Sequence, residues 1–566
     1  MNIMPILAAI AIYPAPKSIV ELGGDFGTED YVVVKKDDPS MAPQSYSLVL
    51  TNGVVEITAA DSDGHFYARE TLNQLGGNIG DRLPNLKIED SPSIAVRGVV
   101  EGYYGRPWGK KGRLALLDFM GRLKLNTYIY GPKDDPYHHT RWREAYPEEN
   151  QKEFKSLLAA AKRNHVRFCW AIHLGGSFRK GGEGEMEDFQ ALYAKLQSMY
   201  DLGIRSFAVF FDDFGDADAQ FHAKICNFVS LGFMRRNEGC MPLIVCPNVY
   251  WGIGESDYCK VLGEELAADT QIIWTGKTVC HDISKIDAEK VAAAYRRPPF
   301  VWWNFPVNDY CRAKLLLGRT YGLDNGVEVS GFVANPMENC EANKIAIFGV
   351  ADWCWNSAAF DSAKNWESAF GYIYPDPEVA AAMRILAAHN SDQAPNSQHY
   401  RREESIAVKG LFRRAIGELE TKGELSTDLE TRIRAVLVEL ADACAVLKRK
   451  LPMEEPELWW EIEGWIGENE FVANSGLKLL DFLAAGGEKD KERLAMDLRR
   501  LKDVRKDNDA RHVAKFAAAT FPADAALVQP PRAATLVIRP FLDAIFAAVA
   551  ADVYRAATGD ENPFAP

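Results

Sequence analysis

Two adjacent aspartates, Asp212 and Asp213, follow an apolar run in the stretch SFAVFFDDFGDADAQ, residues 206–220. Successive side chains of a regular strand point to opposite faces, so both carboxylates can enter one site only if the strand ends or bends there. Two close carboxylates repel each other, and one of them therefore keeps its proton to a higher pH. Such a pair can supply a general acid beside a group that stays ionised.

Two other interpretations of this acidic stretch are open. Aspartate is favoured at helix starts, so one residue of the pair could cap a helix while the other is solvated in a loop. Asp212, Asp213, Asp216 and Asp218 could instead bind Mg²⁺ or Ca²⁺. The stretch lacks the ligand pattern and the glycine placement of a dedicated calcium loop. We therefore expect no metal and no cofactor.

The adjacency of the two carboxylates restricts the chemistry. Hydrolysis of a glycosidic bond by two facing carboxyl groups needs a separation of about 5–5.5 Å or about 6.5–9.5 Å across the bond. Neighbouring residues at one strand end suit two neighbouring groups of one substrate better. A 2-acetamido sugar brings its own nucleophile, since its carbonyl oxygen can attack C1. One aspartate would then serve the acetamide N–H and the other the leaving oxygen, which favours an N-acetylhexosamine.

Eight short apolar runs alternate with helical patterns between Ile94 and Tyr374. Most are continuously apolar, which is typical of parallel strands buried on both faces. Eight strand and helix pairs of this size predict a closed (β/α)8 barrel, the TIM-barrel architecture. The runs read VRGVVEG, LNTYIYGPKDD, VRFCWAIH, SFAVFFDD, PLIVCPNVY, QIIWTG, FVWWNFPVND and VSGFVANP.

Polar residues follow each run, at the strand ends where such a barrel carries its active site. They are Glu101 and Gly102, Lys133 with Asp134 and Asp135, His173, the aspartate pair, Tyr250, Thr275, Asn304 with Asn308 and Asp309, and Asn335. Aromatic residues accompany them, namely Tyr103, Tyr104, Trp274, Trp302 and Trp303. Rings beside carboxylates and amides suit a sugar, whose apolar face stacks while its hydroxyls need directional partners.

The regions on either side of the barrel have different patterns. Residues 1–92 show strand-like alternation and one helical stretch, which predicts a small α+β domain. Residues 93–375 form the α/β catalytic barrel, and the Ala-, Leu- and Glu-rich pattern of residues 376–566 predicts an α-helical domain. Within it, Thr427 and Glu430 could form a capping box, and Pro452 would follow the helix end.

The composition excludes several classes of partner. A formal net charge of −14, without a basic stripe, disfavours nucleic acid and anionic membranes. No apolar run approaches the ~20 residues of a membrane-spanning helix. The ten cysteines include no CxxC pair and several lie in apolar runs, which indicates buried thiols rather than metal ligands or disulfides.

The N-terminal segment MNIMPILAAIAIYPAPKS could be the remnant of a secretory signal, although it is short and lacks a positive start. It could equally be an ordinary first strand. We expect an exported protein, periplasmic or secreted, in a bacterium, with the cytoplasm as the alternative.

Six motifs, in order, resemble glycoside hydrolase family 84, the O-GlcNAcases and related β-N-acetylglucosaminidases. They are GVVEGYYGRPW, LNTYIYGPKDDPYH, FFDDFGD, WTGK, VWWNFPVNDY and GFVANPMENCEANKIAI, within about residues 95–360. The resemblance implies a retaining exo-β-N-acetylglucosaminidase with substrate-assisted catalysis through an oxazoline intermediate. It also implies a bacterial arrangement of a small N-terminal α+β domain, a barrel and a helical domain.

The resemblance also implies roles for individual residues. Asp212 would orient and polarise the acetamido N–H, Asp213 would be the general acid and then the base, and Tyr250 would bond the acetamido or oxazoline oxygen. The residues implied to hold sugar hydroxyls are Gly102 through its backbone, Lys133, Asp309 and Asn335. Those implied to line the acetamido pocket are Thr275, Trp302 and Asn304. Tyr104 and Trp108 are expected in the wall.

Two stretches depart from the family pattern. CPNVYWG stands where Thr-Glu is expected ahead of Tyr250, and AIHLGGSF stands where Pro-Gly commonly follows the histidine. These changes concern the rim and the aglycone side. The expected substrate is terminal β-linked GlcNAc on glycoproteins, mucin or glycosaminoglycan-type glycans. The alternatives are a hexosaminidase, a hyaluronan-acting glycosidase and a non-catalytic glycan-binding protein, and the intact aspartate pair argues against the last.

Overall fold

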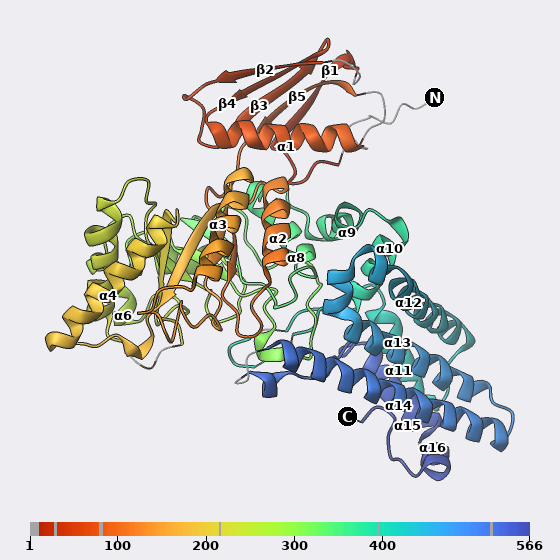
Figure 1. Ribbon diagram of the computed structural model, residues 1–566. Coiled ribbons are helices and arrows are strands. Elements are labelled where there is room, and N and C mark those ends of the chain that lie inside the picture. The colour runs from red at the N-terminus through yellow and green to blue at the C-terminus, as the bar shows by residue number, and fades with distance from the viewer. Residues whose placement is uncertain are drawn as a thin grey trace. The chain divides into compact units, whose positions relative to one another are not determined.

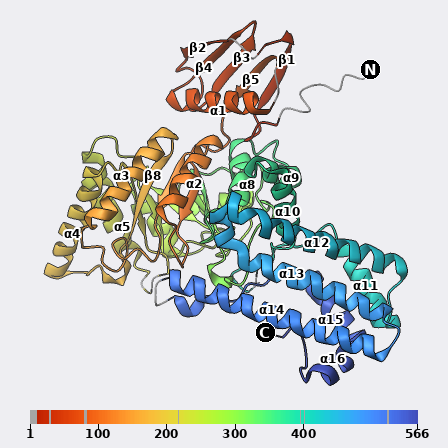
Figure 2. The same cartoon turned by 45° about the vertical axis from the view of Figure 1, so that its right-hand side comes forward.

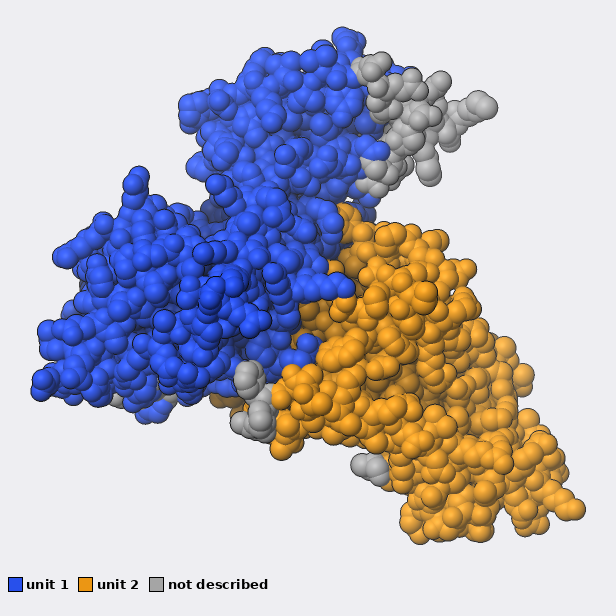
Figure 3. Space-filling view, viewed as in Figure 1, with its two compact units in different colours: residues 1–305, 320–336, 347–365 blue, residues 306–319, 337–346, 366–566 orange. Residues whose placement is uncertain are grey.

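The computed structural model describes residues 11–27, 31–78, 83–213, 215, 217–393, 396–399, 401–520 and 524–565 (Figure 1). Most of the apolar N-terminal segment and Asp216 of the acidic stretch lie outside the described residues. The chain divides into two compact units (Figure 3). The first comprises Met1–Phe305, Thr320–Pro336 and Ile347–Asn365, and the second Pro306–Arg319, Met337–Ala346 and Trp366–Pro566.

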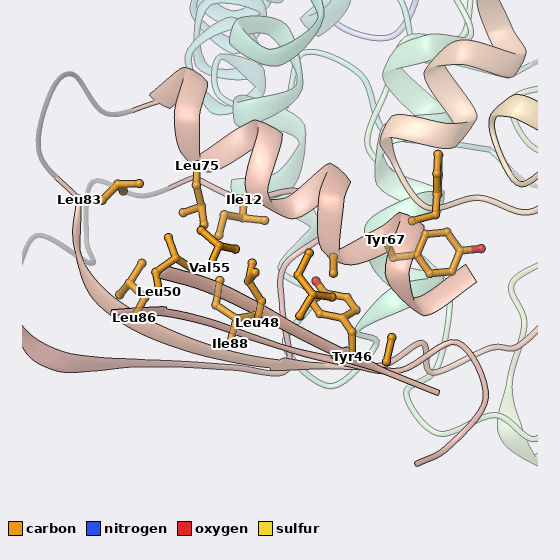
Figure 4. Packing of buried hydrophobic residues seen from close by; sticks show 14 of the residues in the cluster. Ile12, Tyr46, Leu48, Leu50, Val55, Tyr67, Leu75, Leu83, Leu86 and Ile88 are labelled. Carbon is orange, nitrogen blue, oxygen red and sulfur yellow. The ribbon is translucent and has the colours of Figure 1, made fainter. Parts of the chain in front are cut away.

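The first unit begins with a five-stranded sheet in the order β1-β5-β3-β4-β2, in which only β2 and β4 are parallel. Alternate residues of β3 and β4 are buried, and helix α1 packs on that face (Figure 4). The Asn52-Gly53 turn, with both φ angles positive, sets the β3–β4 register. The elements are β1 (Ser18–Asp25), β2 (Val32–Asp37), β3 (Tyr46–Thr51), β4 (Val54–Ala59), α1 (Ser62–Asn78) and β5 (Pro84–Asp90).

Eight parallel strands then form a closed barrel, with the last strand paired to the first. Each of the eight predicted apolar runs contains one of them, so the predicted fold class is confirmed. The interior is filled by apolar side chains that include Val100, Ile129, Phe210 and Trp302. The strands are β6 (Arg97–Glu101), β7 (Thr127–Tyr130), β8 (Arg167–His173), β9 (Ser206–Phe210), β10 (Ile244–Cys246), β11 (Gln271–Trp274), β12 (Phe300–Trp303) and β13 (Gly331–Ala334).

Helices follow most of the barrel strands (Figure 1). They are α2 (Lys110–Arg122), α3 (Glu148–Arg163), α4 (Gly182–Asp201), α5 (Ala219–Asn227), α6 (Asp257–Glu265), α7 (Lys285–Tyr295) and α8 (Lys344–Trp355). All ten cysteines carry free thiols, and nine are buried, as predicted. None of the described helices combines the length and apolarity needed to cross a lipid bilayer.

A buried ion pair joins the N-terminal sheet to the barrel. The Asp90 carboxylate accepts hydrogen bonds from Lys124 Nζ at 3.0 Å, from the Tyr46 hydroxyl at 2.6 Å and from the Trp355 indole at 2.8 Å. Lys124 and Asp90 have fully buried side chains. Burial lowers the pKa of Lys124, although the attraction of Asp90 opposes this effect.

Trp355, the last residue of α8, belongs to the hydrophobic core of the N-terminal sheet. The backbone of this helix end also meets the chain that leads into β6. Ser93 N donates to Trp355 O at 2.8 Å, and Ile94 N donates to Cys354 O at 3.0 Å. The hydrophobic core of the N-terminal sheet therefore includes a residue from α8, the helix that follows the last barrel strand.

Helices make up most of the second unit, and α12, α13 and α14 pack in sequence (Figure 2). The helices of this region are α9 (Ser362–Ile373), α10 (Pro377–Ala388), α11 (Lys409–Lys422), α12 (Thr427–Glu454), α13 (Pro456–Ala484), α14 (Glu488–Ala519), α15 (Ile538–Val549) and α16 (Ala551–Thr558).

The predicted ends of α12 were wrong in detail. Its N-cap residue is Ser426, whose side chain makes no capping bond, and the helix continues through Pro452 to Glu454. A proline so close to the helix end removes only one hydrogen bond, which the packing of α12 against α13 offsets. The domain limits at residues 92 and 375 stay predictions.

We expect Lys124→Ala to lower the free energy of unfolding by about 3–5 kcal/mol, because it leaves the Asp90 carboxylate buried without its cation. Urea denaturation of the whole chain measures this. Lys36 pairs with Glu56 on the same sheet but is exposed, so Lys36→Ala should cost no more than about 1 kcal/mol. Equal losses in the two variants would contradict the assignment.

Candidate active site

The chain turns sharply where β9 ends, and this turn places the aspartate pair. Strand β9 stops at Phe210, and Phe211 N still donates to Cys246 O of the neighbouring strand at 2.9 Å. Asp213 then adopts a left-handed backbone with φ of +59°, which aspartate tolerates better than most side chains. The strand therefore ends before the pair, and Asp212 is buried while Asp213 is exposed.

Asp212 is held by two groups from neighbouring strand ends. Its Oδ2 accepts a charge-assisted hydrogen bond from Lys133, which follows β7 and is buried. His173, at the end of β8, donates from Nε2 to the Asp212 backbone oxygen at 2.9 Å. Asp212 Oδ1 is buried and accepts no hydrogen bond from the described residues. One oxygen of this carboxylate is therefore available to a ligand.

Burial and neighbouring charges determine the protonation of Lys133 and His173, the two groups that hold Asp212. Burial alone would lower the pKa of Lys133, but the Asp212 carboxylate outweighs it, so the pKa of Lys133 is raised. Burial, reinforced by the Lys133 charge, lowers the pKa of His173 to about 2. Lys133 is therefore a cation and His173 is neutral at physiological pH.

Asp213 accepts a hydroxyl hydrogen bond on each carboxylate oxygen. Tyr104 donates to Oδ2 at 2.7 Å, and Tyr250 donates to Oδ1 at 2.9 Å. Burial, together with the charges of Asp213 and Asp212, raises the pKa of Tyr250 well above its usual value. The Tyr250 hydroxyl therefore stays protonated and acts as a donor.

A chain of amides lies at the ends of β12 and β13. Asn304 Oδ1 accepts from the Trp302 indole at 2.8 Å and from Asn335 Nδ2 at 2.9 Å. Asn304 Nδ2 donates to the Val279 carbonyl at 2.7 Å. Asn335 Oδ1 is buried and lacks a hydrogen-bond partner among the described residues. This arrangement leaves one acceptor that could receive a ligand hydroxyl.

Gly102 and Thr275 are placed by their backbones. A Cβ atom added to Gly102 would lie 2.3 Å from Trp302 Cη2, so only glycine fits beside the indole. Thr275 is buried, and its N–H donates to the Tyr250 carbonyl at 2.9 Å. This bond ties the end of β11 to the residue that reaches Asp213.

The first unit thus contains nine of the ten predicted site residues, and hydrogen bonds or close packing link them in small groups. The tenth, Asp309, belongs to the second unit and begins the short 3₁₀ helix Asp309–Cys311. Its contact with a sugar stays a prediction.

Other acidic residues that were considered have structural partners. Glu101 is fully buried and pairs with Arg113, with Nη2 to Oε1 at 2.7 Å. Asp135 accepts from the hydroxyls of Tyr130 and Tyr146 at 2.8 and 2.7 Å. These carboxylates fix the loops after β6 and β7.

The capping alternative for the aspartate pair is wrong. Helix α5 begins at Ala219, and its cap is Asp218, which accepts from Phe221 N at 3.0 Å. Within the described ranges, no three His, Cys, Asp or Glu side chains gather so as to hold a metal ion.

The bond from Tyr104 to Asp213 was not foreseen, because the sequence predicted only a wall position for this tyrosine. Its place two residues after Gly102 at a strand end was the available signal. The reach of the ring across the barrel mouth depends on tertiary structure.

Two family models match this chain. Residues 97–388 match a family described as beta-N-acetylglucosaminidase, and residues 20–91 match domain 2 of glycosyl hydrolase family 20. Among curated proteins, the Protein O-GlcNAcase of Rattus norvegicus and that of Mus musculus are each 33% identical over 272 residues. This match covers 45% of the chain but only 29% of each relative's length.

Solved structures resemble the chain over more of its length. CpGH84B has a TM-score of 0.80 at 28% identity, covering 95% of this chain and 100% of that one. CpGH84D has a TM-score of 0.80 at 24% identity, covering 95% and 99%. A mutant O-GlcNAc hydrolase of Thermobaculum terrenum has a TM-score of 0.66 at 23% identity, covering 83% and 97%. The last two support the fold alone.

We expect Gly102→Ala to lower the free energy of unfolding by about 1–3 kcal/mol, because the new methyl group overlaps the Trp302 indole. Thermal unfolding measures the loss. Gly371 in α9 has no atom near its Cβ position, so Gly371→Ala should stabilise the helix by about 0.5–1 kcal/mol. A neutral effect of Gly102→Ala would mean that the indole moves freely.

Proposed function

The chain belongs to the β-N-acetylglucosaminidase family, and on this basis we propose that it is a retaining exo-β-N-acetylglucosaminidase, O-GlcNAcase-like in its chemistry. The observation that carries the proposal is the unequal environment of Asp212 and Asp213. Asp212 is buried against a lysine with one oxygen unoccupied, and Asp213 is exposed between two phenols.

Asp212 is suited to bind the acetamido N–H. Lys133 holds its Oδ2 in a buried ion pair, while the buried Oδ1 is left to accept a hydrogen bond. A charged acceptor on the N–H pushes electron density toward the acetamide oxygen, which makes that oxygen a better nucleophile. The same bond fixes the acetamide in the orientation that attack on C1 requires.

Asp213 is suited to proton transfer. Its carboxylate is exposed, so it can exchange a proton with water before the substrate covers it. Its neighbour in sequence holds the acetamide, which places Asp213 near the glycosidic oxygen of the same sugar. In these roles the two aspartates act on different atoms, as their different environments require.

The proposed reaction has two steps. The acetamide oxygen bonds to C1 as the bond from C1 to the leaving oxygen breaks, and Asp213 transfers its proton to that oxygen. The Tyr250 hydroxyl donates to the acetamide oxygen and stays protonated. Water then attacks C1 and opens the oxazolinium ring, whose N–H stays bonded to Asp212, and the Asp213 carboxylate takes the water's proton. Two inversions at C1 give overall retention.

The remaining predicted residues fit the sugar in this scheme. Asn335 Oδ1 can accept from a sugar hydroxyl, and the Gly102 backbone lies against the indole of Trp302. Thr275 and Asn304 support the acetamido side. One N–H of Lys133 bonds to Asp212, and its two further N–H donors could reach a sugar hydroxyl.

The natural substrate is proposed to carry a terminal β-linked GlcNAc on a glycoprotein, a mucin or a glycosaminoglycan-type glycan, and the protein is proposed to meet it outside the bacterial cytoplasm. A panel of gluco- and galacto-configured aryl glycosides and polymeric hyaluronan distinguishes this activity from that of a hexosaminidase or a hyaluronan-acting enzyme. A glycan-binding protein without catalysis would turn over none of them.

We expect Asp213→Asn to slow hydrolysis of aryl β-N-acetylglucosaminides with poor leaving groups by about 10²–10⁴-fold, and to spare those with good leaving groups, because only the former need an acid. Asp212→Asn should slow both kinds, because the acetamide is activated for every substrate. Steady-state kcat across a leaving-group series tests this. Parallel losses in both variants across the series would exclude the assigned roles.

A further inference from the structure

The Tyr250 hydroxyl has a single proton and two possible acceptors for it. In the structure it donates to Asp213 Oδ1 at 2.9 Å. In the proposed reaction it donates to the acetamide oxygen of the substrate. One hydroxyl proton cannot make both bonds at full strength. Arrival of the acetamide must therefore remove a hydrogen bond from Asp213.

This loss matters because both phenols favour the charged form of Asp213. A carboxylate that accepts hydrogen bonds is stabilised relative to the neutral acid. Before the substrate binds, Tyr104 and Tyr250 both donate to Asp213, one to each oxygen. The first step of the reaction, however, needs Asp213 protonated. Without substrate, the two hydrogen bonds thus favour Asp213 as a base rather than as an acid.

Among the described residues around Asp213, no other group changes its charge when the acetamide arrives. Asp212 precedes Asp213 in the chain, and Lys133, His173 and Cys246, at the ends of other barrel strands, interact electrostatically with Asp213. The Lys133 charge is paired with Asp212. Burial keeps His173 neutral, and burial raises the pKa of the Cys246 thiol and keeps it uncharged. Lys133, His173 and Cys246 therefore each hold one charge state through the neutral range.

We propose that the substrate's acetamide takes the Tyr250 hydroxyl from Asp213, and that Asp213 gains its catalytic proton from water as a consequence. Tyr104 keeps its bond to Oδ2 and acts as a positioning residue, so the proton resides on Oδ1. This inference rests on the proposed function. Asp213 then becomes a general acid only when a sugar with a 2-acetamido group is bound.

The atoms balance in this exchange. Tyr250 keeps its proton and changes only its acceptor, from Asp213 Oδ1 to the acetamide oxygen. Solvent supplies one proton to Oδ1, since Asp213 is exposed. That proton leaves with the departing alcohol when the bond to C1 breaks. In the second step Asp213 takes a proton from the attacking water. When the regenerated acetamide departs, Asp213 returns this proton to solvent, and Tyr250 again donates to the Asp213 carboxylate.

Binding of N-acetylglucosamine, the product sugar, provides a test without turnover. Between the free and bound pKa values of Asp213, binding should take up as much as one proton, seen by calorimetry in two buffers of different ionisation enthalpy. Because binding raises the pKa, affinity should increase as the pH falls, by at most tenfold per pH unit. A lost hydrogen bond to a charge makes this window on the order of one to two pH units wide.

Two matched phenylalanine variants separate the roles of the tyrosines. Tyr250→Phe should abolish the proton uptake, because the bond to Asp213 is missing in both states. Tyr104→Phe should keep the uptake but move its window to higher pH, because a donor is lost from both states. Asp213→Asn should show no uptake. Replacement of a residue with a purely structural role would not shift the pH range over which binding takes up a proton.

If Tyr250→Phe binds the sugar too weakly for calorimetry, pH profiles give the same answer. With a poor leaving group, the basic limb of kcat should lie at higher pH than that of kcat/KM in the wild type. The two limbs should coincide in Tyr250→Phe and remain apart in Tyr104→Phe.

The inference is overturned if wild-type binding takes up no proton, or if Tyr250→Phe takes up as much as the wild type. Those results leave the proposed function standing as long as aryl β-N-acetylglucosaminides are hydrolysed and Asp213→Asn shows the expected leaving-group dependence. Absence of any turnover by the wild type would instead reject the proposed function itself.

Discussion

The buried ion pair between Lys133 and Asp212 is the interaction on which the rest of the site depends. It pairs the Asp212 carboxylate with a buried ammonium group at the end of a strand. With Oδ2 occupied, the direction of Oδ1 is fixed, and the left-handed turn at Asp213 carries the next carboxylate out to solvent. The two aspartates thereby acquire different chemistry from their surroundings alone, although they are identical in type and adjacent in sequence.

The neutral groups around this pair are as important as the charged ones. Burial removes the charge from His173, which can then donate to a backbone carbonyl rather than compete with Lys133 for Asp212. The same effect keeps the Cys246 thiol and the Tyr250 hydroxyl protonated. Among these described groups, charge is therefore confined to Lys133 and the two adjacent aspartates, so a hydrogen bond made or broken at Asp213 has a strong effect.

Much of this arrangement could be predicted from sequence. Continuous apolar runs located all eight strands, and the polar residues after them located Lys133, Tyr250 and Asn335. Contacts that cross the barrel could not be predicted. Glu101 and Asp213 both follow apolar runs, yet one is paired with an arginine and the other is bound by phenols, which only tertiary structure decides.

Trp355 has a consequence for the order in which the protein can be made. The N-terminal sheet leaves the ribosome before the barrel, but its core includes this tryptophan, and its buried Asp90 is bonded to the indole and to Lys124. Nascent chains generally fold domain by domain from the N-terminus. Here the N-terminal domain has an incomplete core until translation has passed the eighth barrel strand. Its folding can therefore be completed only after the barrel has been synthesised.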